Sequence, residues 1–170
     1  MLRPELTDPA GRVVVAPAVY TTRGVLRRIP LVASIDGTLV PTLALEMLRV
    51  AARTPSLRVS VSGASVTGVS VGRLGVPTEA DGAVRVYFSA HSADRFVSAI
   101  DVLEGRIDPA QLRGQLVLIG LTGVGLLEYL DTPIGARMSG SEIQAQLLEN
   151  LVDGKLLRRP AWGPGLEALV

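Results

Sequence analysis

The sequence predicts a single α/β domain with a mixed sheet, helices packed on it and an interior strand at residues 116–121. Three observations support this fold class. The chain has 170 residues, of which 48% are hydrophobic, and this is enough for one domain with a buried core. Short runs rich in Val, Leu and Ile alternate with segments of helical periodicity. No internal repeat or low-complexity linker divides the sequence.

The first third of the chain is expected to be rich in strands. Residues 11–19 form a β-branched run, and residues 24–41 predict a strand, an Asp36-Gly37 turn and a return strand. An Asp-Gly pair between apolar runs favours a type I′ hairpin, because glycine tolerates a positive φ. Pro41 then precedes a predicted helix over residues 42–53. This helix is apolar on two faces and is therefore expected to pack between layers.

The middle of the chain predicts further strands. Alternating Val, Ser and Gly residues indicate two strands that turn near Gly63. A second Asp-Gly pair, Asp81-Gly82, precedes a predicted strand over residues 83–88. The run LVLIGL at residues 116–121 is apolar on both faces, as expected for the central strand of a covered sheet.

Two more helices are predicted from their end signals. The first has Ser92 as its N-cap and Gly105 as its C-terminal stop. Its apolar face is formed by Phe96, Ala99, Ile100 and Leu103. The second begins with a capping box of Ser139 and Glu142 and ends at Gly154. Its buried stripe is formed by Ile143, Leu147 and Leu151.

The composition argues against several function classes. The net charge is +1 without a basic cluster, which argues against nucleic acid as a partner. The chain has no cysteine and one histidine. It therefore cannot form disulfides, a thiol nucleophile, a Cys-ligated zinc site or a multi-histidine metal site, and a histidine-based triad is not expected. We expect no cofactor and no resident metal.

The glycine-punctuated stretch GLTGVG, residues 120–125, is a candidate phosphate loop. It lacks the Lys-Ser/Thr of a Walker loop and the glycine order of a dinucleotide fingerprint. The nearby acids Glu128 and Asp131 would repel a phosphate unless a metal were present. The sequence favours a plain strand-to-loop turn. The alternative is a small phosphate- or nucleotide-handling enzyme that uses Glu128 or Asp131 as a metal ligand.

A small polar ligand site is predicted just beyond residues 116–121, because ligand sites in open α/β sheets favour the carboxyl ends of strands. Its candidate residues are Thr122, Glu128, Asp131, Thr132 and Glu142. In the alternative interpretation, which we favour, Asp131, Thr132 and Pro133 form a simple turn and Glu142 caps its own helix.

Other polar residues carry weaker predictions. Arg27 and Arg28 alternate on a strand and are expected to be an ordinary surface pair, with a weak anion site as the alternative. His91 is expected to be an exposed loop residue. The Arg-Arg pair at 158–159 and Trp162, beside an apolar end, resemble a membrane-interface boundary. A Trp that closes a small core is the alternative.

Several motifs together resemble a known family. In chain order they are GVLRRIPLV, PTLALEMLR, AVRVYFSA, LRGQLVLIGLTGVGL, DTPIG and GSEIQAQLLENLVDGKLLRRPAW. This series, over residues 24–162, resembles the type 2 CHASE domain, the sensory extracellular domain associated with cyclases and histidine kinases. Three positions depart from the family pattern: residues 21–24 replace an Asp-rich D-x-D-G, Gln144 replaces a usual His, and Thr122-Gly123 replaces Thr-Ala. The departures concern ligand chemistry rather than the fold.

The resemblance implies a periplasmic-side sensor that is not an enzyme. Such a domain relays a small-molecule or protein stimulus through transmembrane helices to a cytoplasmic cyclase or kinase. Residues 1–162 would be the sensory domain without the N-terminal half of other members, and residues 163–170 would begin a membrane-proximal segment. An uncovered face of the 42–53 helix, or an edge strand, predicts a homodimer. A purely structural dimerisation module is the remaining alternative.

Overall fold

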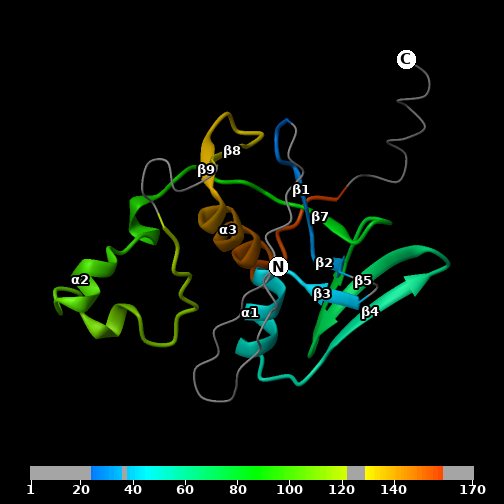
Figure 1. Cartoon of the computed structure of the whole chain (residues 1–170), viewed down its shortest axis with the longest axis horizontal. Helices are drawn as coiled ribbons and strands as arrows, with labels where there is room; N and C mark the ends of the chain where they lie inside the picture. The colour runs from blue at the N-terminus through cyan, green and yellow to red at the C-terminus, as the bar shows by residue number, and fades with distance from the viewer. Residues whose placement is uncertain (1–23, 36–37, 122–128, 159–170) are drawn as a thin grey trace.

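Helix α3 (Gly140–Asp153) lies at the centre of the structure, a computed structural model that describes residues 24–35, 38–121 and 129–158 (Figure 1). Ser139 is the N-cap, and its Oγ accepts a hydrogen bond from the backbone N–H of Glu142 at 3.3 Å. Gly154 ends the helix at a φ of 66°, which glycine adopts without a Cβ penalty. Both ends are where the sequence predicted them. The predicted stripe of Ile143, Leu147 and Leu151 is buried.

Helix α1 (Leu43–Ala51) confirms the helix predicted over residues 42–53. It contacts α3 and strand β5 (Ser65–Val71), so it packs against two layers as expected. The buried Thr42 hydroxyl donates a hydrogen bond to the carbonyl of Leu31 at 3.1 Å. The N–H of Ala44 donates to Oε1 of Gln144 at 3.2 Å, which ties the first turn of α1 to α3.

Glu46 is a buried acid within α1, and Arg49 lies one turn further along the helix. Nε of Arg49 donates to Oε2 of Glu46 at 2.7 Å, and Nη1 donates to the carbonyl of Thr54 at 2.8 Å. The hydrogen bond to Glu46 raises the pKa of Arg49, against the opposing effect of burial. A raised pKa of a base means that the stability it contributes is lost only as the pH rises through that raised pKa. Arg49 therefore keeps its charge throughout the neutral range.

The strands form four small antiparallel sheets, which corrects the expectation of one mixed sheet. Strand β4 (Leu57–Ser62), β5 and β6 (Leu74–Pro77) form a three-stranded meander. The three remaining pairs are β1 (Arg28–Pro30) with β7 (Ala83–Arg85), β2 (Val32–Ile35) with β3 (Thr38–Pro41), and β8 (Tyr129–Asp131) with β9 (Arg137–Ser139). Among the described residues, the parallel pairing is an isolated bridge between Val66 and Asp81.

The predicted hairpins are confirmed. Strands β2 and β3 pair with Ile35 opposite Thr38, while the Asp36-Gly37 turn between them lies outside the described residues. Strands β4 and β5 turn through Gly63, which has a φ of 59°. The run at 11–19 also lies outside the described residues.

The core fills the space between α1, α3 and the inner faces of the strands. Its buried members come from helices α1 and α3 and from several strands and their flanking residues: Leu26, Ile29, Leu31, Leu45, Val69, Val84, Met138, Ile143 and Leu147. Burial of about 25 cal/mol per Å² of apolar surface is the main driving force for this arrangement.

The strand predicted over residues 83–88 is extended, but its ladder ends at Arg85. Beyond that point α3 side chains replace a neighbouring strand. Oδ1 of Asn150 accepts from the N–H of Tyr87 at 2.7 Å, and Nδ2 donates to the Tyr87 carbonyl at 3.1 Å. Gln146 does the same at Ser89, with distances of 2.9 and 3.1 Å. Side-chain amides thus satisfy backbone groups that would otherwise need a strand partner.

Residues 96–121, here called the 96–121 arm, differ most from the sequence prediction. Two short helices, η1 (Ala93–Arg95) and α2 (Ala99–Leu103), replace the single predicted helix. Ser92 makes no capping hydrogen bond, and Ser98 is the N-cap residue of α2. The predicted apolar face is largely exposed, with Leu103 at 83%. Figure 1 shows why: α2 lies well away from the sheets, with no layer beside it to cover the face.

The interior strand predicted at 116–121 is wrong. These residues form no strand, and Ile119 is 92% exposed. A strand needs a partner for its backbone groups, and none of the described strands pairs with residues 116–121. The apolar composition of the run was therefore not sufficient to place it in a sheet.

Candidate functional site

A cavity of about 600 Å³ lies between the 96–121 arm and the first turns of α3. We call it the α3 cavity. It is lined by residues 95–100, residues 118–120 and four residues of α3: Ser141, Glu142, Ala145 and Gln146. Ligand pockets have volumes of roughly 300 to 1,000 Å³ and are mostly apolar with a few polar groups. The α3 cavity has both properties, since Phe96, Ile100 and Ile119 contribute apolar surface.

The polar centre of the α3 cavity is Glu142. Its side chain is 8% exposed, and Oε1 lies 3.0 Å from Nδ1 of His91. The imidazole is 58% exposed and stacks against Phe96 with ring centroids 4.7 Å apart. The pair connects the segment before η1 to the first turn of α3 across 51 positions of sequence. Sequence reasoning expected an exposed loop histidine, which the structure confirms, but it did not predict the contact with Glu142.

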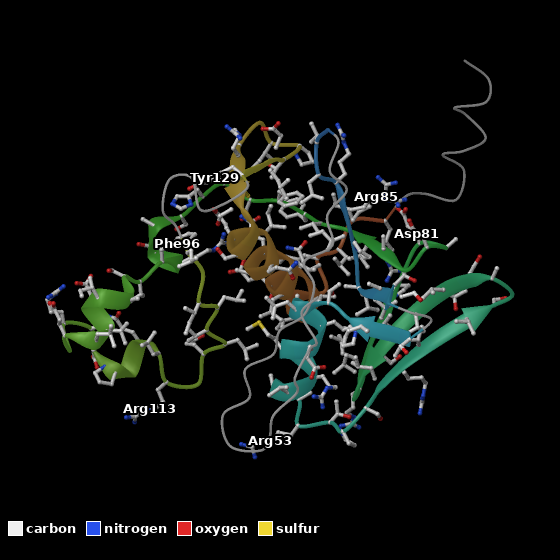
Figure 2. All side chains as sticks on the ribbon, viewed as in Figure 1. Arg53, Asp81, Arg85, Phe96, Arg113 and Tyr129 are labelled. Carbon is white, nitrogen blue, oxygen red and sulfur yellow. The ribbon has the colours of Figure 1, made fainter. Side chains whose placement is uncertain are left out.

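Arg95 is the cation that lines the α3 cavity among the described residues. Its guanidinium is held by groups outside the cavity lining. Nη2 lies 3.1 Å from Oε2 of Glu149, and Nη1 donates to Oγ of Ser89 at 3.1 Å. The charge of Arg95 is therefore already compensated. Figure 2 shows Phe96, the next residue, on the side of α3 that faces the arm.

Gly120 lines the cavity next to the first turn of α3. A Cβ on this residue would lie 2.7 Å from both Cβ and Oγ of Ser141, closer than real Cβ atoms approach. Glycine lets the arm backbone reach the first turn of α3. The first glycine of the GLTGVG stretch therefore allows a close approach of two backbones. Residues 122–128, which include the rest of that stretch, lie outside the described residues.

The predicted ligand-site residues are placed in different surroundings. The Asp131 side chain is 65% exposed and pairs with Nε of Arg137 at 3.5 Å. Thr132 is buried, and its Oγ1 donates to the Ala136 carbonyl at 2.7 Å in the turn between β8 and β9. Neither residue lines the α3 cavity, whereas Glu142 does.

Thr122 and Glu128 lie outside the described residues, so the five-residue site stays a prediction. The structure describes part of the alternative interpretation. Asp131 is the last residue of β8, and the turn that follows runs from Thr132 to Gly135, whose N–H donates to the Thr132 carbonyl at 3.0 Å. Glu142 forms one of the two hydrogen bonds of a capping box: its backbone N–H donates to Oγ of Ser139. Its carboxylate contacts His91 instead of forming the second.

The predicted arginine pair separates. Arg27 is exposed, and Nη1 donates to the Val25 carbonyl at 3.5 Å. Arg28 pairs with Glu79 and Asp81, and Nε of Arg85 binds the other oxygen of Glu79 at 2.6 Å. Figure 2 shows Asp81 and Arg85 on the side of α3 opposite Phe96. This network holds β1 against the 79–83 turn. Because Arg28 and Arg85 are already paired with carboxylates, they are poor binding partners for an anion.

Two further observations limit the chemistry. The described residues contain no group of three or more His, Asp or Glu side chains that could hold a metal ion. No helix among them has the length and hydropathy needed to cross a bilayer. The features of the 158–162 stretch beyond Arg158 lie outside the described residues.

The described residues form an α/β domain with a cavity against helix α3 that both polar and apolar side chains line. The family model of the CHASE2 domain matches residues 4–170, and the chain belongs to this family. CHASE2 domains are sensory extracellular domains of signalling receptors. No curated protein and no solved structure matches the chain. The family identity predicted from the sequence motifs is thus confirmed.

Proposed function

We propose that this domain is the extracytoplasmic sensor of a transmembrane receptor, and that it senses a stimulus bound in the α3 cavity. One observation carries the proposal. The same helix of 14 residues forms the cavity wall with its first turns and ends next to residues 155–158, where the described part of the chain ends. That segment is held to β7, because the N–H of Leu157 donates to the carbonyl of Arg85 at 3.0 Å.

This connection suggests how a signal would travel. An occupant of the α3 cavity would touch Glu142 and Gln146, and Gln146 also holds the backbone of Ser89. A small shift of α3 would then move both its C-terminal end and the extended chain after β7. A packed helix moves as a unit, so a displacement at one end appears at the other. We propose that the residues after the domain transmit this shift through the membrane to a cyclase or kinase domain.

The function that we propose is not enzymatic. The family is sensory rather than catalytic. Among the described residues, the one histidine pairs with Glu142 at the cavity, and no group of three or more His, Asp or Glu side chains could hold a metal ion. An enzyme that uses the 120–125 stretch is less well supported, because Gly120 serves the contact with Ser141.

We also propose that the receptor works as a homodimer. Helix α1, which the sequence suggested as the interface, has α3 and β5 as neighbours. The 96–121 arm instead carries exposed apolar side chains outside the lining of the α3 cavity, among them Val102, Leu103 and Leu121. Exposed apolar surface of this kind commonly marks an association site. Light scattering after size-exclusion chromatography at low micromolar concentration should show twice the 17.9 kDa chain mass, and a monomer would contradict the proposal.

The location of the domain can be tested by labelling. The chain has no cysteine, so one introduced cysteine reports on a single position. Ser62→Cys lies in the exposed end of β4. In the full-length receptor without other cysteines, a membrane-impermeant maleimide should label Ser62→Cys in cells whose inner membrane is intact. Labelling only after that membrane is disrupted would place the domain in the cytoplasm and exclude the proposed function.

The coupling through α3 can be tested separately. Two glycines inserted after Gly154 would separate α3 from the Leu157 bridge without touching the cavity. We expect this insertion to change the basal output of the full-length receptor. The same insertion after Gly63, in the β4–β5 turn, is the matched control and should leave the output unchanged. Equal effects of both insertions would contradict a signal path through α3.

A further inference from the structure

We propose that the α3 cavity binds a small organic cation, an amine or guanidine with an apolar body, whose charged head pairs with Oε2 of Glu142. This proposal rests on the sensory function above and names the chemistry of the stimulus.

The first argument is the free oxygen of Glu142. Oε1 is engaged by His91, whereas Oε2 has no hydrogen-bond partner within the described residues. Every fully buried side-chain oxygen and nitrogen of the described residues does have a partner. Oε2 must therefore be reachable from the cavity that Glu142 lines. A carboxylate that is 8% exposed yet keeps one open oxygen is a strong acceptor for a positively charged donor.

The second argument is the charge balance of the cavity. Arg95 is bound to Glu149 and Ser89, so no uncompensated cation of the described lining is available for an anionic ligand. An anion in this position would approach the buried Glu142 carboxylate without a counter-charge, which is unfavourable because like charges repel. The N-terminus of α3, which could attract an anion, already carries Glu142 in its first turn.

The third argument is the shape of the lining. Phe96, Ile100 and Ile119 border the space next to Glu142 and present apolar surface to it. A ligand with an apolar body would cover these side chains, which water now reaches. One ionic contact beside a larger apolar surface is the arrangement that fits an amine with a hydrocarbon body.

The test uses three probes of equal length with the whole chain: hexylammonium, hexanol and hexanoate. Binding is measured by NMR titration. We expect hexylammonium to bind about tenfold more tightly than hexanol, the gain of one charged hydrogen bond. Hexanoate should bind most weakly.

Glu142→Gln keeps an acceptor for His91 and removes the charge. It should reduce hexylammonium affinity to that of hexanol. Glu104→Gln removes a carboxylate that is outside the cavity and paired with Arg106, and it should leave the amine preference intact. Circular dichroism melting shows whether each variant folds. If Glu142→Gln does not fold, the probe selectivity of the unmodified chain decides the question.

Hexanol or hexanoate binding as tightly as the amine would overturn the proposal, and so would binding of none of the three probes. A full amine preference in folded Glu142→Gln would also overturn it. These outcomes leave the maleimide labelling of the receptor unaffected. The probe-binding test can thus contradict the proposed ligand chemistry without contradicting the sensory function. The labelling test can likewise contradict the sensory function without contradicting the ligand chemistry.

Discussion

Helix α3 and the 96–121 arm have similar apolar content but opposite surroundings. In α3, Ile143 and Leu147 are fully buried, whereas in the arm Leu103 and Ile119 are mostly exposed. The difference begins with local order. Helix α3 has a capping serine, 14 residues and a closing glycine, while α2 has five residues and no side-chain cap. A long, capped helix can bury a continuous stripe, and a helix of five residues cannot, because short helices are barely stable alone.

The comparison also assigns stability and sensing to different parts of the molecule. The α1–α3 body holds the buried core, and the arm forms one wall of the α3 cavity without contributing to that core. Segments with few buried apolar contacts open at low free energy. A wall with this property can respond to a ligand while the body keeps its fold. Four predictions test this division, from the largest expected effect to the smallest.

Leu147→Ala, in the body, should have the largest effect. Leu147 is fully buried in α3, so its truncation leaves a cavity and should lower the free energy of unfolding by about 4 kcal/mol. The matched change in the arm is Leu103→Ala, where the side chain is 83% exposed. It should change the free energy by less than about 0.5 kcal/mol. Urea unfolding followed by circular dichroism measures both, and equal losses would contradict the division.

Arg49→Met should break the buried pair of α1. It leaves Glu46, which is 4% exposed, without its cation, and should cost about 3 kcal/mol. The double change Glu46→Leu with Arg49→Met removes both charges and should recover most of the loss. Thermal melting of the single and double variants gives the comparison. If the double variant is as unstable as Arg49→Met, Glu46 is not the source of the cost.

Asn150→Ala should weaken the junction of α3 with the chain after β7. It removes both hydrogen bonds to Tyr87 and should cost about 1 to 2 kcal/mol. Amide hydrogen exchange should speed up at Tyr87. Gln111→Ala, on the exposed η2 (Pro109–Gln111) of the arm, is the control and should leave that exchange unchanged.

Gly120→Ala should have a small global effect and a clear local one. The new Cβ meets Ser141 and should push the arm away from α3, with a loss of less than about 1 kcal/mol in global stability because the arm lies outside the core. Limited proteolysis should cut residues 96–121 faster. Gly75→Ala, where a Cβ meets only Ser70 Oγ at 3.9 Å, should not. Adding Ser141→Gly to Gly120→Ala should restore resistance, and failure of that rescue would refute the contact.

Much of the fold could be predicted from local signals. The β2–β3 hairpin, the Gly63 turn and helix α1 were all predicted, because the residues that decide each element lie within a few positions of one another. The α/β class and the family followed from the order of such elements. Of the predicted site residues that the structure describes, Glu142 lines the cavity. The sequence indicated it both as a candidate ligand residue and, in the alternative interpretation, as a helix-capping residue.

The sequence by itself determined where α3 begins and ends, since Ser139 and Gly154 act on backbone groups within one turn. Tertiary structure alone decided whether residues 116–121 form a strand and which residue contacts His91. An apolar run becomes a strand only where another strand can form hydrogen bonds with its backbone. No local sequence pattern shows whether such a strand lies nearby in the fold. The contacts of His91 with Glu142, and of Ala44 with Gln144, join residues 51 and 100 positions apart. Such contacts exist only after the core has brought distant segments together.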